Sequence, residues 1–138
     1  MILSFIEVKN LTHIFRENDE KKTEKIALDN INLKIDKGEF IAIIGVNGSG
    51  KSTLAKHFNG LLLPSEGECV VDGMKVDDSE DIWKVRQKVS MVFQNPDNQI
   101  IATVVEDDIA FGPENMGLER EEIKDRIEFA LKSLHIEH

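Results

Sequence analysis

Hydrophobic and polar residues alternate along the first part of the chain in the way that predicts β-strands. Residues 5–9 (FIEVK) and 11–15 predict a first extended segment, and the polar run 16–25 predicts a solvated loop without an assigned function. In 31–35 (INLKI), the hydrophobic positions fall on one face of a strand and the polar positions on the other. An N-terminal antiparallel sheet with one solvated face is therefore expected.

Two later segments are hydrophobic without alternation. Residues 40–44 (FIAII) and 89–93 (VSMVF) are nearly continuous hydrophobic runs. Such runs are typical of strands that are covered on both faces, as in a parallel sheet. The sequence thus predicts that the chain passes from an edge sheet into a core sheet, in an α/β fold.

Local signals between and after these runs predict a hairpin and short helices. The segment 68–76 carries Asp-Gly between two strand-like runs, which indicates a tight hairpin turn. Residues 54–58 predict a helix that ends at Asn59-Gly60. Residues 81–88 predict another short helix, in which Trp83 is expected to be a buried hydrophobic anchor.

The last part of the chain is predicted to be helical. Thr103 and Glu106 have the spacing of a capping box, and Gly112-Pro113 is expected to end the helix that it opens. The expected buried side of this helix consists of Ile109, Ala110 and Phe111. From Glu119 onward, hydrophobic residues recur at helical spacing, which predicts a second, amphipathic helix. These residues are Ile123, Ile127, Ala130, Leu131 and Leu134.

Composition narrows the class of protein. The chain of 138 residues is 41% hydrophobic, as expected for a globular domain, and its net charge of −9 argues against binding nucleic acid or anionic lipid through bulk electrostatics. No hydrophobic run approaches a membrane span, and the N-terminus lacks the features of a signal peptide, so a cytoplasmic chain is expected. The single cysteine, Cys69, lies in a hydrophobic strand-like run, where a buried structural thiol is favoured over a reactive one.

The strongest chemical signal is GVNGSGKST, residues 45–53, which fits G-x-x-x-x-G-K-[ST] between a hydrophobic run and a helix-like segment. Its glycines allow backbone N–H groups to approach phosphate oxygens, and the following helix adds a positive N-terminal end. Lys51 is expected to reach the β- and γ-phosphates, and the Ser52 hydroxyl to bind Mg²⁺. The alternative, an ordinary glycine-rich turn, is less favoured because of the context. The candidate nucleotide-binding residues are Gly45, Val46, Asn47, Gly48, Ser49, Gly50, Lys51, Ser52 and Thr53.

Three further residues have open interpretations. Phe15 ends an N-terminal strand, where its ring could stack on a purine base or pack in the core. Gln94 follows a predicted core strand, and it is a candidate catalytic residue that could bind Mg²⁺ or orient a water, or it could simply belong to a polar turn. His57, on the predicted helix, receives no role.

Together, the N-terminal strands, GVNGSGKST, the hairpin and the glutamine after VSMVF resemble the nucleotide-binding domain of ATP-binding-cassette (ABC) transporters over nearly the whole chain. Residues 92–118 are similar, more narrowly, to the A1-type ATPase subunits of energy-coupling factor (ECF) importers, which are also known as cobalt-import ATP-binding proteins. The resemblance implies a Walker A loop at 45–53, with Gln94 as the Q-loop glutamine that contacts Mg²⁺. Phe15 would be the A-loop aromatic, where relatives often carry Tyr.

The resemblance also implies elements that are not found in residues 95–138: the LSGGQ signature, the Walker B aspartate with its catalytic glutamate, and the switch histidine. The sequence is therefore expected to be an N-terminal piece. Residues 1–96 would hold the β-subdomain and part of the core, and 97–138 the start of the helical subdomain. Without a Walker B strand, 40–44 would expose a few hundred Å² of hydrophobic surface at a cost of several kcal/mol, at ~25 cal/mol per Å². This stretch alone is expected to fold poorly.

The expected function is that of an ATP- and Mg²⁺-binding subunit at the cytoplasmic face of the membrane, which energises import of vitamins or transition-metal ions such as cobalt. Its expected partners are a second, homologous ATPase subunit, in a homo- or heterodimer, a transmembrane coupling subunit and a substrate-binding membrane subunit. No nucleic acid partner is expected. The alternatives are a nucleotide-binding module without turnover and a P-loop kinase or GTPase. The transported substrate stays open.

Overall fold

The chain divides into two units, Met1–Met91 and Val92–His138, each with its own internal packing. The computed structural model describes residues 4–16 and 24–136. Residues 17–23 of the polar run expected as a solvated loop lie outside these described residues, but the expectation is wrong for its ends, since Arg16 ends one strand and Glu24 and Lys25 begin the next.

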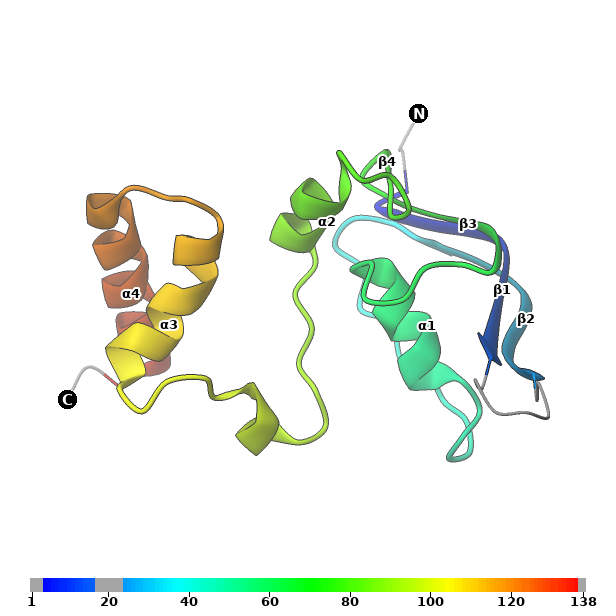
Figure 1. Cartoon of the computed structure of the whole chain (residues 1–138), viewed down its shortest axis with the longest axis horizontal. Helices are drawn as coiled ribbons and strands as arrows, with labels where there is room; N and C mark the ends of the chain where they lie inside the picture. The colour runs from blue at the N-terminus through cyan, green and yellow to red at the C-terminus, as the bar shows by residue number, and fades with distance from the viewer. Residues whose placement is uncertain (1–3, 17–23, 137–138) are drawn as a thin grey trace. The chain divides into compact units, whose positions relative to one another are not determined.

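The antiparallel sheet predicted for the N-terminal sequence is confirmed. Strand β1 (Ile6–Arg16) pairs with β2 (Glu24–Ile35) and with β3 (Glu66–Val71), and β3 pairs with the short β4 (Met74–Lys75). The order is β2-β1-β3-β4 (Figure 1). The long central strand β1 is thus hydrogen-bonded on both sides.

The predicted Asp-Gly hairpin joins β3 to β4. Asp72 and Gly73 both have positive φ, 48° and 81°, as a tight two-residue hairpin turn requires. The Lys88 ammonium lies 2.6 Å from the Asp72 carboxylate, so an ion pair links this turn to the end of the following helix. The carboxylate is exposed, and its pairing with Lys88 lowers its pKa.

Two helices accompany the sheet in the first unit. Helix α1 (Lys51–Phe58) ends at Asn59, as predicted, and α2 (Ile82–Lys88) confirms the second predicted helix. The expectation for Trp83 is wrong, since its side chain is 62% exposed and lies against the Arg86 guanidinium, 5.5 Å from the ring centroid. A helix of this length offers few inward positions, and Val85 occupies the buried one.

The hydrophobic core of the first unit lies between one face of the sheet and the two helices. Its buried members are Ile6, Val8, Leu11, Leu28, Leu54, Cys69, Val71, Val76 and Val85. Other positions on the sheet carry ion pairs: the Glu7 carboxylate lies 2.9 Å from the Lys34 ammonium and 3.0 Å from that of Lys9. The alternation of the sequence therefore separates a packed face from a solvated one.

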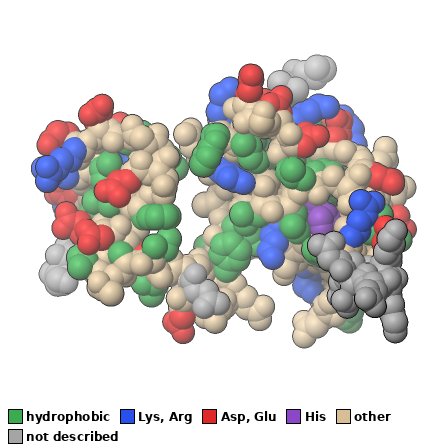
Figure 2. Space-filling view, in the orientation of Figure 1, with side chains coloured by type: hydrophobic (Ala, Val, Ile, Leu, Met, Phe, Trp, Pro, Cys, Tyr) green, Lys and Arg blue, Asp and Glu red, His purple; other side chains and the backbone are tan. Residues whose placement is uncertain are grey.

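The predicted core strands at 40–44 and 89–93 are wrong for this chain. Both segments run without strand pairing, and Phe40 and Ile44 are 97% and 93% exposed. Hydrophobic side chains are correspondingly visible at the surface (Figure 2). A strand needs a hydrogen-bonding neighbour, and the described residues supply none for either run. The α/β class is confirmed, but the sheet that forms is antiparallel.

The second unit contains a 3₁₀ turn, η1 (Pro96–Gln99), and helices α3 (Val105–Asn115) and α4 (Arg120–Leu134), which pack against each other. Ala110 and Ile127 are its most buried hydrophobic residues. The division into domains at 96/97 stays a prediction.

Details of these helices differ from the sequence expectation. The capping box does not form: the N-cap is Val104, and the Asp108 carboxylate accepts hydrogen bonds from the Ile101 and Ala102 amides instead. Helix α3 continues through Pro113, because a proline removes only one helical hydrogen bond and the chain turns after Asn115. Two of the residues expected on buried faces are exposed, Phe111 at 44% and Leu134 at 68%.

Candidate functional site

The segment 45–53 folds as a tight turn that leads directly into α1. The Ser49 amide donates a hydrogen bond to the Val46 carbonyl, 3.2 Å away. Gly48 and Gly50 have φ of 80° and 90°, in the left-handed region that glycine adopts without strain. The glycines of the motif therefore stand where the backbone reverses before the helix begins.

Gly50 is required for a second reason, which is its contact with β2. A Cβ on Gly50 would lie 2.6 Å from the Ala27 carbonyl oxygen and 2.9 Å from Cδ2 of Leu28. At the first glycine of the motif, a Cβ on Gly45 would meet the Ser49 hydroxyl at 2.7 Å. The turn is thus packed against the sheet on one side and against itself on the other.

Lys51 turns back over the loop that precedes it. Its ammonium donates hydrogen bonds to the carbonyls of Gly45 and Val46, both at 2.8 Å, and lies 3.5 Å from the Ser49 hydroxyl. A positive charge is therefore held over the turn by backbone oxygens. Such a held charge, beside backbone N–H groups, is suited to bind an anion.

Ser52 lies in the first turn of α1 with an exposed side chain, next to the half-buried Thr53. The first N–H groups of a helix lack partners within the helix, and the helix dipole makes this end positive. A hydroxyl oxygen is a ligand that Mg²⁺ accepts, together with phosphate oxygens. The loop, the ammonium of Lys51 and the Ser52 hydroxyl thus fit a magnesium nucleotide. A Cβ placed on Gly48 would meet no atom within 4 Å, so the space beside this glycine is open.

Phe15 lies near the end of β1, opposite Lys25 of β2, and its side chain is 41% exposed. Its ring packs edge-to-face against the ring of His13, with a centroid separation of 4.6 Å. The ring is therefore supported by a neighbour while part of it stays open to solvent. Base stacking at Phe15 remains a prediction.

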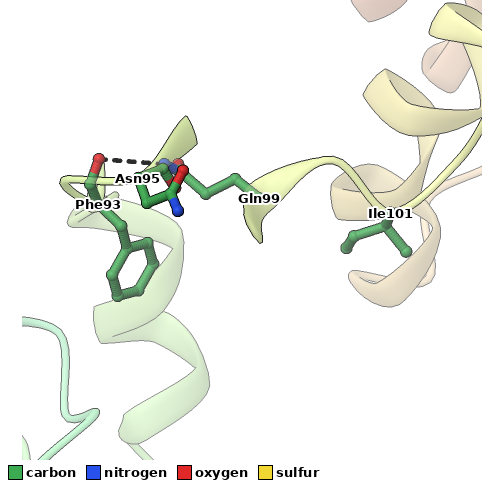
Figure 3. A pocket seen from close by; sticks show the side chains of 4 residues that line it. All are labelled: Phe93, Asn95, Gln99 and Ile101. Carbon is green, nitrogen blue, oxygen red and sulfur yellow. Dashed lines mark hydrogen bonds between the residues drawn. The ribbon is translucent and has the colours of Figure 1, made fainter. Parts of the chain in front are cut away.

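Gln94 belongs to the second unit, where its side chain is exposed. The side-chain amide nitrogen of Gln99 donates a hydrogen bond to the Phe93 carbonyl, at 3.2 Å (Figure 3). The same nitrogen lies 3.4 Å from the Asn95 carbonyl. Phe93, Asn95, Gln99 and Ile101 line an open cavity of about 570 Å³, and Gln94 is not among its lining residues. The role of Gln94 toward nucleotide and Mg²⁺ stays a prediction.

Two histidines that received no function from the sequence form the polar centre of the first unit. His57 of α1 is 0% exposed and His13 of β1 is 8% exposed. Nε2 of His57 lies 3.2 Å from Nδ1 of His13. The sequence carried only a weak signal that His57 is buried, because His57 stands three residues after Leu54 and therefore on the inward side of α1. No sequence signal placed His13 beside it.

Burial controls the chemistry of the titratable groups in this core. It lowers the pKa of His57, an effect to which His13 adds, whereas hydrogen bonding to the Thr53 and Leu63 carbonyls acts in the opposite direction. Burial also raises the pKa of the Cys69 thiol to about 12, so the thiol stays protonated at neutral pH. The interpretation of Cys69 as a buried structural residue is confirmed.

Comparison with known families shows which family the chain belongs to. Residues 28–138 match the family model described as ABC transporter. The chain belongs to the ABC transporter family. This match begins in β2 and includes the loop at 45–53, the rest of the first unit and all of the second.

The resemblance of this ABC chain to ECF ATPase subunits is also confirmed. The energy-coupling factor transporter ATP-binding protein EcfA1 of Clostridium novyi (strain NT) is 53% identical over 133 residues, covering 96% of this chain and 47% of that protein. The protein of the same name from Bacillus subtilis (strain 168) is 46% identical over 132 residues, covering 96% and 45%. The chain thus spans about half the length of the curated relatives it matches.

Solved structures agree with this placement in the ABC family. The structure of cbiO1 from Clostridium perfringens, part of the ABC transporter complex cbiONQ, matches with a TM-score of 0.76 and 41% identity, covering 98% of this chain and 52% of that one. The dimeric bacterial ABC transporter cassette MJ0796 matches with a TM-score of 0.74 and 32% identity, covering 94% and 56%.

Among the described residues of this chain, no helix has the length and hydrophobicity needed to span a bilayer.

Proposed function

We propose that this chain is the nucleotide-binding portion of an ATPase subunit that energises ECF-type membrane import of vitamins or transition-metal ions. The observation behind the proposal is the loop at 45–53, which delivers the Lys51 ammonium and the first turn of α1 to one place. The names of the relatives, energy-coupling factor transporter ATP-binding proteins, support the type of transporter. Cobalt is one candidate cargo among several.

Each candidate residue has a defined task in this proposal. The N–H groups of the loop and Lys51 hold the β- and γ-phosphates, and the Ser52 hydroxyl holds Mg²⁺. The metal ion supplies charge neutralisation for the phosphates when it is bound. Phe15 stacks on the base, and Gln94 orients the water that attacks the γ-phosphate or senses the nucleotide. Residues 95–138 contain no identifiable general base, so we assign turnover to the whole protein.

The proposed partners follow from the same assignment. A second, homologous ATPase subunit would pair with this one, in a homo- or heterodimer, to hydrolyse ATP across the shared interface. A transmembrane coupling subunit and a substrate-binding membrane subunit would complete the importer. The chain would then work at the cytoplasmic face of the membrane.

The test of nucleotide binding removes the charge over the loop. Lys51→Ala in the full-length protein should abolish ATP binding measured by calorimetry, because it removes the cation opposite the terminal phosphates. Lys56→Ala removes a charge from the same helix at a position outside the motif, and it should leave the affinity within about twofold. Micromolar affinity retained by Lys51→Ala would refute the assignment.

A second test separates the alternatives. Gln94→Ala should reduce phosphate release and transport more than ATP binding, and unchanged transport would return Gln94 to a simple turn residue. ATP binding without phosphate release by the full-length protein would favour a nucleotide-binding module without turnover. A preference for GTP over ATP would favour a P-loop GTPase. Measuring binding and release on the same sample keeps these outcomes apart.

A further inference from the structure

The buried pair His13 and His57 is the feature of the first unit that the proposed function leaves unexplained. Imidazoles buried in a hydrophobic core are costly unless their nitrogens find hydrogen-bond partners. Here every buried side-chain nitrogen and oxygen in the part of the chain that the structure describes has a partner. The two rings therefore belong to one hydrogen-bonded unit with the backbone.

The partners of the two rings assign their protons. Nδ1 of His57 lies 2.7 Å from the Thr53 carbonyl, and Nδ1 of His13 lies 3.1 Å from the Leu63 carbonyl. Carbonyl oxygens only accept, so both Nδ1 atoms carry a proton and donate it. Nε2 of His57 then acts as an acceptor, and the single Nδ1–H of His13 is shared between this nitrogen, at 3.2 Å, and the Leu63 carbonyl, at 3.1 Å. The two backbone carbonyls therefore set which nitrogen of each ring carries the proton.

This unit connects two parts of the candidate nucleotide site. Thr53, which accepts from His57, is the last residue of the phosphate-loop motif. At the other end, the His13 ring contacts the Phe15 ring edge-to-face, at an interplanar angle of 77°. A continuous path of contacts therefore runs from the loop through the two imidazoles to Phe15.

Strand β2 contacts both ends of this region. Gly50 packs against Ala27 of β2, and Lys25, two residues earlier on the same strand, pairs with Phe15. Two strand residues span about 7 Å. Phe15 and Gly50 thus both lie against the same stretch of β2, residues 25–28.

We propose that His13 and His57 form a positioning pair that holds the Phe15 ring for base stacking and so sets the preference of the site for ATP over a bare triphosphate. This inference rests on the proposed function, since it assumes a nucleotide at the loop. His13 and His57 do not touch the nucleotide themselves. They act through Phe15 at one end and Thr53 at the other.

The experiment compares two ligands of the full-length protein, ATP and inorganic tripolyphosphate, each with Mg²⁺, by displacement of a fluorescent ATP analogue. Phe15→Ala sets the full size of the stacking effect, which is about 5- to 100-fold in ATP affinity. His13→Asn keeps a donor at the Nδ1 position but lacks the ring, and His13→Phe keeps a ring but lacks the N–H. Val8→Ala, a core variant on the same strand, reports plain destabilisation.

Both His13 variants should lower the ATP affinity about 5- to 10-fold, as part of the stacking effect, and leave the tripolyphosphate affinity within about twofold. Val8→Ala should lower the melting temperature and leave the ratio of the two affinities unchanged. Equal losses for both ligands would show that the pair is only structural and would overturn the inference. Wild-type selectivity in His13→Phe would overturn it too, because ring bulk alone would then suffice.

Failure of the proposed function gives a different result. If the wild-type protein bound neither ATP nor tripolyphosphate, the assignment of 45–53 as a phosphate-binding loop would be refuted, and so would the positioning role. If the wild-type protein bound both ligands and Phe15→Ala changed neither affinity, the loop would stand and only the inference would be overturned.

Discussion

Replacing Gly50 by alanine tests the contact between the loop at 45–53 and β2. The left-handed φ of 90° costs an alanine about 1–2 kcal/mol relative to glycine. The added Cβ would also lie 2.6 Å from the Ala27 carbonyl oxygen, a backbone atom that cannot rotate away. Forcing such a methyl group into a packed site costs about 1–3 kcal/mol more. Gly50→Ala should therefore lower the free energy of unfolding by about 2–5 kcal/mol.

Gly48 provides the matched control in the same turn. Its φ of 80° imposes similar strain on an alanine, but a Cβ there would meet nothing within 4 Å. Both changes also restrict the unfolded chain equally, so that effect cancels in the comparison. Denaturant unfolding of the full-length protein without nucleotide should show Gly50→Ala to be less stable than Gly48→Ala by about 1–3 kcal/mol. Equal destabilisation would refute the packing of Gly50 on β2.

Further predictions concern the buried histidines and the second unit. Because the pKa of His57 is lowered in the folded state, the unfolded chain takes up a proton first as the pH falls below about 6.5, and stability is lost from there down to the folded pKa. Thermal melts between pH 7.5 and 5 should show this loss, and His57→Gln should remove its histidine component; an unchanged slope would contradict the assignment. In ¹⁵N-edited spectra of the full-length protein, His57 and His13 should both show a proton on Nδ1, and an Nδ1 without a proton in either ring would contradict the proton assignment. Asp108→Ala should speed hydrogen exchange at the Ile101 and Ala102 amides, which donate to that carboxylate at 2.7 and 3.1 Å, and unchanged exchange would show that these hydrogen bonds do not persist in solution.

The local elements of this chain could be read from its sequence because their signals are local. Alternation located β1 and the last five residues of β2, the Asp72-Gly73 pair located the hairpin, and helical spacing located α4. The same reasoning failed for 40–44, where a hydrophobic run indicates burial but does not identify a neighbour. Strand formation depends on a hydrogen-bonding partner far along the chain, and a run of residues carries no information about whether that partner is present.

The candidate site divides in the same way. The candidate nucleotide-binding residues at 45–53, with Lys51 and Ser52 among them, could be proposed from the sequence because their spacing along the chain is itself the motif. Only the folded structure shows the contact of Gly50 with β2 and the pairing of His13 with His57, because these contacts join residues 22 or more positions apart in sequence. The chemistry that one continuous segment offers can be predicted from its residue types. The groups that support that segment depend on how the strands and α1 pack.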